Sequence, residues 1–177
     1  IGAKNYIKSC LDSLLRQTPL PSEIIVIDNS VKSCLDREIN KLCPSVKLYP
    51  GSERISYSAA LNKGIGLSNG EFVLCLNDDV ILDKEFICRG LKGFSLGENI
   101  GSVSGKILRS DGKTLDSTGQ FLSIWRTAKE RGYGKSDSGQ FEQGGFIFGV
   151  NGAAAFYRRE MLEAVKDKNG YFDSRFG

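Results

Sequence analysis

The sequence contains no histidine. A chain without histidine cannot form a Ser-His-Asp triad, a Cys-His catalytic pair or a histidine-ligated metal centre. Any chemistry must therefore use carboxylates, hydroxyls, thiols, lysine or arginine. Because oxygen-rich sites suit hard cations, the cofactor that we expect is Mg²⁺ or Mn²⁺.

Other absences disfavour two further classes of protein. No apolar run reaches the length needed to cross a membrane, and no signal peptide is visible. The 24 basic and 21 acidic residues leave a formal charge of only +3 and are scattered along the chain. The sequence therefore gives no electrostatic case for a nucleic-acid partner.

The cysteines lack the spacing of a zinc site or a redox pair. Their number is odd and no CxxC pair occurs among them: Cys10, Cys34, Cys43, Cys75 and Cys88. We interpret them as reduced thiols in the core of a cytoplasmic protein.

Apolar periodicity in the first half alternates between helix and strand. It predicts helices over 3–17, 33–42, 56–67 and 83–94, and strands over 23–28, 46–49 and 72–76. This alternation indicates a single α/β domain over 1–177, with a Rossmann-like, mostly parallel sheet flanked by helices. The carboxyl ends of parallel strands meet at one rim of the sheet, where ligands usually bind.

The second half is rich in glycine and more irregular. The pattern predicts short strands over 102–108 and 146–150, a hairpin turn over 110–112 and a helix over 158–166. We therefore divide the domain into a nucleotide-binding half, 1–95, and a half that shapes a second pocket, 96–177.

Two glycine-rich segments are similar to phosphate-binding loops but lack their spacing. GIGLSNG, residues 64–70, precedes a strand where a dinucleotide fingerprint should follow one. GSVSGK, residues 101–106, is one residue shorter than a P-loop and is followed by Ile107 instead of Ser or Thr. Dinucleotide-dependent oxidoreductases and P-loop ATPases are disfavoured accordingly.

Aspartates end two of the predicted strands. Asp78 and Asp79 follow the buried run FVLCL, and their mutual repulsion would be relieved by a divalent cation bound to a diphosphate. A solvated turn is the alternative for this pair. Asp28 fits either an Asx-turn or a hydrogen-bond acceptor for a base or ribose, and the spacing does not choose between them. By the topology above, all three carboxylates should share one rim.

Several blocks in register carry a resemblance to a known family. EIIVIDNS, SYSAALNKG and GEFVLCLNDDV, in this order and spacing, resemble the family 2 glycosyltransferases of the GT-A fold. The resemblance continues through DSTG, RGYG, GQFEQGGFIFGVNGAAAFYRREML and GYFDSRFG, which are similar to the rhamnosyltransferase-like branch. It covers nearly the whole chain.

The resemblance implies roles for residues of the first half. Asp28 matches the acid that contacts the nucleotide base, and Asn62 and Gly64 match a motif near the donor nucleotide. Asp78 matches a residue that contacts the ribose or a phosphate, and Asp79 matches a metal ligand. Asp78 is the second residue that we expect at the metal.

In the second half, Asn151 and Gly152 match the segment that lines the donor-sugar and acceptor side, although a strand-to-turn junction would explain them equally well. Arg131 could meet a phosphate or an acceptor, but a surface arginine is the default. The sequence departs from the family where glycines are usual, at Ser56, Ala59 and Ala60.

The activity implied is metal-dependent, inverting transfer of a sugar from a nucleoside-diphosphate sugar to a glycan or lipid-linked glycan, in cell-surface polysaccharide synthesis. The location implied is the cytoplasm, at the inner face of the membrane where the acceptor is lipid-linked. A sugar-phosphate nucleotidyltransferase and a non-catalytic α/β binding module are the alternatives.

Two family features fall outside the sequence. Family members open with an apolar strand at the centre of the sheet, and here the chain begins at Ile1, just after it. The Glu-Asp motif that supplies the catalytic base is expected beyond Gly177, because Asp173 matches an earlier family aspartate. We therefore expect a fragment with no catalytic base of its own, which binds the donor weakly and transfers sugar poorly.

Overall fold

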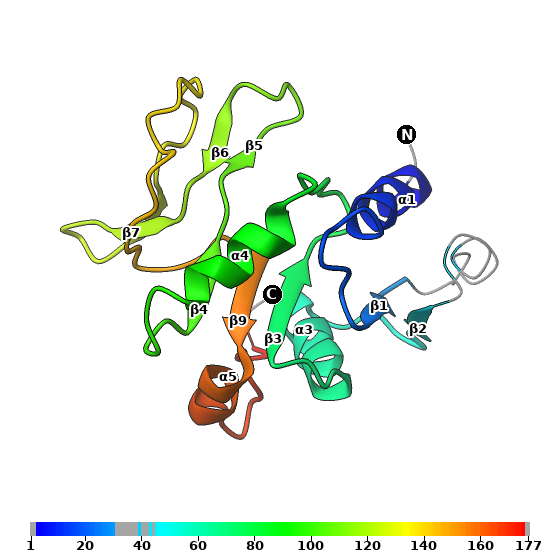
Figure 1. The fold of residues 1–177 in the computed structure, drawn as a ribbon. Helices are drawn as coiled ribbons and strands as arrows, with labels where there is room; N and C mark the ends of the chain where they lie inside the picture. Colours follow the sequence, from blue (N-terminus) through cyan, green and yellow to red (C-terminus); the bar gives the residue numbers. More distant parts are fainter. Residues whose placement is uncertain (1–2, 31–38, 40–42, 44, 176–177) are drawn as a thin grey trace.

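The computed structural model describes residues 3–30, 39, 43 and 45–175 (Figure 1). Its helices are α1 (Ala3–Leu14), α3 (Tyr57–Leu67), α4 (Phe86–Phe94) and α5 (Arg159–Val165). Its longer strands are β1 (Ile24–Asp28), β2 (Val46–Pro50), β3 (Phe72–Leu76) and β9 (Ala154–Arg158). Its shorter strands are β4 (Ser102–Ser104), β5 (Ile107–Leu108), β6 (Leu115–Ser117), β7 (Gln120–Leu122) and β8 (Ala128–Glu130). The predicted helix over 33–42 falls largely outside the described residues.

The strands form separate hydrogen-bonded ladders. β1 and β2 pair in parallel, with Ile24 opposite Val46 and Asp28 opposite Pro50, as predicted. β3 differs from the prediction, because it pairs antiparallel with β9, which also pairs antiparallel with β4. A cavity of about 1500 Å³ is lined by residues of β1 and β3, which belong to different ladders.

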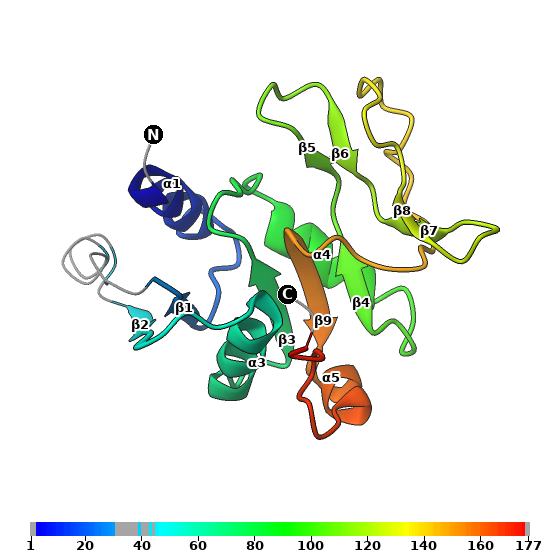
Figure 2. The ribbon, with the colours of Figure 1, turned by 180° about the vertical axis from the view of Figure 1, so that it is seen from behind.

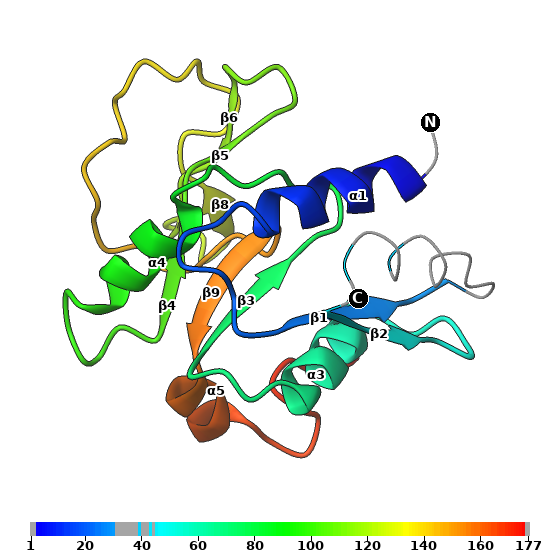
Figure 3. The ribbon, with the colours of Figure 1, turned by 45° about the vertical axis from the view of Figure 1, so that its right-hand side comes forward.

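Alternating side chains of β3 face two hydrophobic clusters. Phe72, Leu74 and Leu76 pack on the cluster that α1 and α4 cover, whereas Val73 and Cys75 belong to the cluster of α3 and α5. Helices therefore cover both faces of this sheet, which is the layering expected of an α/β domain (Figure 3).

The second half is irregular, as predicted, but its strands differ in detail. The segment 102–108 is split into β4 and β5, and the turn at 110–112 closes the β5–β6 hairpin with Gly112 at φ +66°. The strand predicted over 146–150 is wrong: the structure gives this segment an isolated bridge between Gly149 and Gln120. Phe146 and Phe148 are exposed, so no sheet buries this apolar run.

The described cysteines are free thiols. Cys10, Cys43 and Cys75 are buried, as predicted, whereas Cys88 is only partly buried; Cys34 lies outside the described residues. No helix in the described part of the chain is both long and apolar enough to cross a membrane.

Candidate functional site

The carboxyl ends of β1 and β3 open onto the same cavity. Asp28, at the end of β1, and Asn77 and Asp78, just after β3, line one end of it. Figure 3 shows that both strands point toward this side. Most of the lining from β1 and β3 is apolar, and apolar side chains offer no hydrogen-bonding partners to a phosphate. The polar rim is therefore the part suited to a nucleotide.

Asp28 is buried and forms an Asx-turn. Its side chain is 4% exposed, and Oδ1 accepts hydrogen bonds from the backbone N–H of Ser30 at 2.9 Å and from the Ser30 hydroxyl at 2.6 Å. The Asp28 carbonyl accepts from the N–H of Gly51 at 2.8 Å, where a Cβ on residue 51 would lie 2.8 Å from the same oxygen. The close approach of the two loops thus fixes Asp28 at the rim.

Asn29 continues this attachment. Its amide donates to the carbonyl of Ile55 at 2.7 Å and accepts from the Ile55 N–H at 2.8 Å. Ser56 then caps α3, because its hydroxyl accepts a hydrogen bond from the N–H of Ala59 at 3.2 Å. The serine at this family glycine position has a local role as a helix cap.

Asp78 and Asp79 occupy the corner of a turn in which the N–H of Val80 approaches the carbonyl of Asn77 at 3.4 Å. Both side chains are exposed, and within the described part of the chain neither forms a salt bridge. Asp78 lines the cavity together with Asp28, whereas Asp79 lies outside the lining. Asp28 and Asp78 therefore meet at one cavity, as predicted. Asp79 follows Asp78 in the sequence but does not line the cavity.

The negative charge of this turn affects the pKa of Cys10 in helix α1. Burial, and then the negative charges of Asp78 and Asp79, raise the pKa of the Cys10 thiol to about 11. The Cys10 thiol also lies 3.6 Å from the Asn77 carbonyl, which it can approach as a weak donor. Cys10 is therefore a neutral contact behind the turn.

Two buried polar residues, Ser13 in α1 and Gln17 just after it, bind the segment that follows the turn. The hydroxyl of Ser13 accepts from the N–H of Leu82 at 3.0 Å. The amide of Gln17 donates to the carbonyl of Asp83 at 2.7 Å and accepts from the N–H of Ile87 at 3.0 Å. Sequence reasoning missed both residues, although polar side chains on the apolar face of a helix are a signal of such bonds.

Tyr57 connects the two halves of the site and was also missed. Its hydroxyl lies 2.9 Å from the Asn77 Oδ1 and 3.0 Å from the carbonyl of Gly152, so its single proton is shared between two acceptors. The Asn77 N–H donates to the carbonyl of Ala153 at 2.9 Å. Asn151 caps this junction, since its Oδ1 accepts from the Ala153 N–H at 2.8 Å. Asn151 and Gly152 thus adjoin the rim at a strand-to-turn junction.

Asn62 and Gly64 face different surroundings. The Asn62 amide donates to the Phe172 carbonyl at 2.7 Å and to the Asn169 carbonyl at 3.2 Å, and accepts from the Phe172 N–H at 2.9 Å. Its hydrogen-bonding groups therefore hold the C-terminal segment. Gly64 lines the cavity, and a Cβ at this position would lie 3.5 Å from the Ile27 side chain.

Arg131 lies in the second half, where it is tied into the β7–β8 region. Its guanidinium donates to the Thr118 hydroxyl at 3.0 Å and to the Thr118 carbonyl at 2.9 Å, and lies 5.2 Å from the ring of Phe141. These contacts support the structural interpretation of this arginine.

The carboxylates of the turn are compatible with a hard cation. Among the described residues, no group of three or more His, Cys, Asp or Glu side chains forms a complete metal centre. Mg²⁺ and similar ions take one or two carboxylates and complete their shell with phosphate oxygens and water. An exposed Asp-Asp pair beside an open rim fits this requirement, whereas an all-protein metal cage does not.

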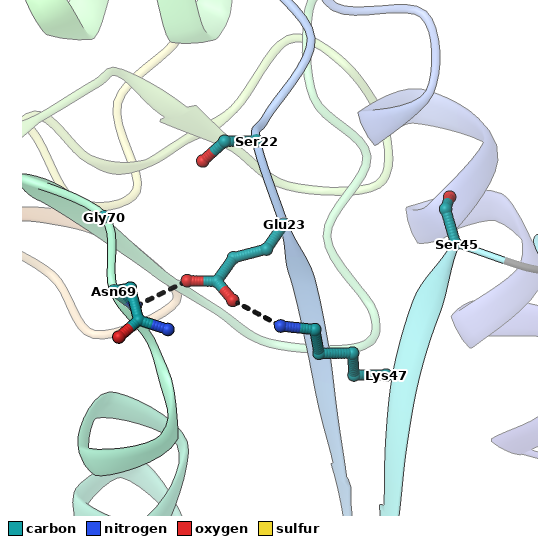
Figure 4. Close-up of a pocket in the computed structure, with 6 residues that line it drawn as sticks. All are labelled: Ser22, Glu23, Ser45, Lys47, Asn69 and Gly70. Carbon is teal, nitrogen blue, oxygen red and sulfur yellow. Dashed lines mark hydrogen bonds and ion pairs between the residues drawn. The ribbon is translucent and has the colours of Figure 1, made fainter.

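A smaller cavity of about 310 Å³ lies at the opposite end of β1 (Figure 4). There Glu23 accepts from the N–H of Asn69 at 2.6 Å and from the ammonium of Lys47 at 3.0 Å. These bonds, the Asn69 bond first, hold the pKa of Glu23 below its ordinary value. Each oxygen of the carboxylate thus accepts one hydrogen bond, and these bonds join the start of β1 to β2 and to the loop before β3.

Comparison with known proteins identifies the class to which this fold and site belong. The model of the glycosyl transferase family 2 matches residues 2–166, so the chain belongs to that family. Glycosyltransferase GlyA of Streptococcus pneumoniae serotype 4 is 29% identical over 91 residues, which make up 49% of this chain and 13% of that protein. The chain thus spans a small part of this relative's length.

A solved structure confirms the fold. The mannosyltransferase PcManGT from Pyrobaculum calidifontis, in complex with GDP-Man and Mn²⁺, superposes with a TM-score of 0.60 at 17% sequence identity. The match covers 91% of this chain and 43% of that one. The α/β class and the GT-A-type fold predicted from the sequence are therefore confirmed.

Proposed function

We propose that the chain binds a nucleoside-diphosphate sugar at the polar rim between β1 and β3. The observation that carries the proposal is that Asp28 and Asp78, from strands far apart in sequence, line one cavity at the strands' carboxyl ends. Asp28 would accept from the base, and Asp78 would contact the ribose or a phosphate. The GDP-Man bound to the structural neighbour supports a donor of this class.

The reaction that we infer is inverting transfer of the sugar to a hydroxyl group. The acceptor oxygen forms a bond to the anomeric carbon as the bond from that carbon to the diphosphate breaks. The hydroxyl proton would pass to a carboxylate base, which is none of the residues assigned here, because an alcohol that keeps its proton is a poor nucleophile. Tyr57 and Asn77 would hold the donor rim against the Asn151–Gly152 junction, which we assign to the sugar and acceptor side.

We assign a divalent cation, Mg²⁺ or Mn²⁺, to Asp79 with Asp78 beside it. When bound, it would neutralise the charge that develops on the diphosphate leaving group. The Mn²⁺ in the structural neighbour and the absence of salt bridges to these carboxylates among the described residues support this assignment.

The acceptor that we infer is a glycan or a lipid-linked glycan used in cell-surface polysaccharide synthesis, at the cytoplasmic face of the membrane. Membership of family 2 supports transfer to such a hydroxyl acceptor.

Calorimetry with UDP, dTDP and GDP, each with and without Mn²⁺, tests the proposal. We expect one nucleotide to bind with a heat that depends on Mn²⁺. Asp79→Asn should weaken binding in Mn²⁺ about tenfold or more and reduce the difference between the two conditions, since it removes a charged ligand of the cation and even the loss of an outer-shell partner lowers metal affinity about 10–100-fold. Glu98→Gln, at an exposed acid outside the cavity, is the matched control.

The alternatives give different outcomes. A non-catalytic α/β module should show no metal-linked heat with any nucleotide. A sugar-phosphate nucleotidyltransferase should release pyrophosphate from a nucleoside triphosphate and a sugar phosphate. Either result would contradict the proposed donor site.

A further inference from the structure

The β7–β8 hairpin presents large apolar side chains to solvent at its tip. Ile124 is 90% exposed and Trp125 80% exposed, and Phe121 and Leu122 on β7 are nearly half exposed. Figures 1 and 2 show the hairpin projecting from the rest of the domain, away from α1, β1 and β2. Leaving such side chains in water forfeits about 1.5–3 kcal/mol each relative to burial.

The exposure is built into an ordered turn. The N–H of Ser123 donates to the carbonyl of Thr127 at 2.9 Å, and the N–H of Arg126 donates to the carbonyl of Ser123, also at 2.9 Å. The two hydroxyls of Ser123 and Thr127 bond to one another at 2.7 Å, and Arg126 adopts φ +57°. Ile124 and Trp125 thus lie in a turn that is closed by hydrogen bonds between its flanking residues.

The base of the hairpin is equally well fixed. Gln120 donates its side-chain amide to Glu130 at 2.7 Å, and Ser117 bonds to the same carboxylate. The carbonyl of Gln120 accepts from the N–H of Phe148 at 2.9 Å, and Phe148 and Phe146 are 64% and 93% exposed. The neighbouring segment therefore adds aromatic surface beside the hairpin.

The hairpin and the residues that follow it carry more basic than acidic side chains. Between residues 120 and 135 the chain carries one acid, Glu130, whose carboxylate is engaged at the base, against four basic residues: Arg126, Lys129, Arg131 and Lys135. Arg126 lies within the turn itself, and Lys129 pairs across the ladder with Phe121. Arg126 and Lys129 are both exposed.

We propose that the tip of the β7–β8 hairpin, with Ile124 and Trp125 leading, docks into the headgroup region of an anionic lipid bilayer. Trp is favoured at this depth because its ring is amphipathic, and Arg126 and Lys129 would meet lipid phosphates. A neutral glycan would leave the exposed charges of Arg126 and Lys129 without a counter-charge, whereas lipid phosphates supply one. A second protein would need a broad complementary face, whereas Ile124 and Trp125 lie between β7 and β8 in a hairpin that projects from the domain (Figures 1 and 2).

The proposal is independent of the donor chemistry, because membrane contact is measured without nucleotide. Trp125 is the single tryptophan of the chain, so its fluorescence reports directly on the tip. The probe is a set of vesicles of phosphatidylcholine alone or mixed with phosphatidylglycerol. We expect the emission to shift to the blue, and to resist acrylamide quenching, with the anionic vesicles.

Variants separate the apolar and charged contributions. Ile124→Ser should weaken co-sedimentation with anionic vesicles about tenfold. Arg126→Gln and Lys129→Gln should each weaken it about fivefold and reduce its salt dependence. Leu96→Ser, at a single side chain that is 79% exposed elsewhere, should leave binding unchanged.

Three results would overturn the proposal. One is an emission spectrum that anionic vesicles do not change. Another is a blue shift that depends on protein concentration without lipid, which would identify a second copy as the partner. The third is vesicle binding by folded Ile124→Ser equal to that of the unsubstituted chain, with folding checked by circular dichroism.

Discussion

At the scale of single residues, polar side chains near the cavity serve two purposes. The side chains of Asn29, Ser13 and Gln17 form hydrogen bonds with backbone atoms and so fix the loops around the rim. Asp78 and Asp79 are exposed, with no salt bridge in the part of the chain that the structure describes. The first group builds the site, and the second group is available to a ligand.

The aspartates could be predicted because a buried run ending in acids is a local pattern. Tyr57 could not, because its acceptors lie at Asn77 and Gly152, and only tertiary structure brings these segments together. The same limit applies to Asn62, whose partners lie at 169–172.

Asn62→Ala should destabilise the chain by about 1–3 kcal/mol, because it removes three hydrogen bonds and leaves groups of the segment 169–172 unsatisfied. Urea unfolding measures the loss. Lys63→Ala, at the next and exposed helical position, should change stability by less than about 0.5 kcal/mol. If Asn62→Ala instead lowered nucleotide affinity at unchanged stability, the role implied by the family resemblance would be the correct one.

Glu23 should make stability depend on pH. Its pKa in the folded chain lies below the ordinary value of 4.5, first because of the Asn69 N–H and then because of Lys47. A depressed pKa stabilises the fold above the unfolded pKa, and this contribution is lost as the pH falls through the folded pKa. The difference in unfolding free energy between the unsubstituted chain and Glu23→Gln should therefore shrink below about pH 4.5.

Urea titrations at a series of pH values measure this difference. Lys47→Met is the control, because it keeps the larger contribution from Asn69 and should retain most of the pH dependence. Parallel pH profiles for Glu23→Gln and the unsubstituted chain would show that the Glu23–Asn69 bond does not form.

At the scale of elements, strong periodicity was a reliable guide and weak strand signals were not. The strands β1, β2 and β3 were predicted from their apolar, β-branched runs. β9 was missed, since three alanines before Phe156 give little strand signal. Yet Ala154 and Ala155 are buried, and β9 is the middle strand of its sheet. The close approach of α4 to β9 lies at Phe156, whose ring faces Gly90.

Replacing a helical glycine by alanine should change stability in opposite directions at two positions. At Gly90 in α4 a Cβ would lie 2.4 Å from the ring of Phe156, which is buried and stacked on Phe86, so Gly90→Ala should cost about 1–3 kcal/mol. At Gly66 in α3 a Cβ meets nothing within 4 Å, so Gly66→Ala should stabilise by about 0.5–1 kcal/mol. Thermal unfolding of both variants shows whether each substitution raises or lowers the stability. A gain in stability at Gly90 would contradict the close packing of α4 on β9.

At the scale of the whole molecule, the sequence predicted the layers but not how the strands are joined. Alternating helices and strands imply helices on both faces of a sheet, and the two clusters on either side of β3 have this arrangement. Strand pairing depends on partners far along the chain, and β3 takes its neighbour from residues 154–158. The division into halves at residue 95 remains a prediction, although β9 and α5 return to pack beside the first half.

The two ladders beside the cavity should open at different free energies. β9 is hydrogen-bonded on both sides, by β3 and β4. β1 and β2 pair only with each other among the described strands, and helix packing and a few hydrogen bonds from loops connect them to the rest of the domain. Hydrogen exchange followed by mass spectrometry should therefore find the β9 amides slowest, exchanging through global unfolding. The β1 and β2 amides should exchange faster, through an opening that exposes less surface, so urea should accelerate their exchange only weakly. Equal rates and equal urea dependence in both ladders would mean that the domain opens as one unit despite the cavity between β1 and β3.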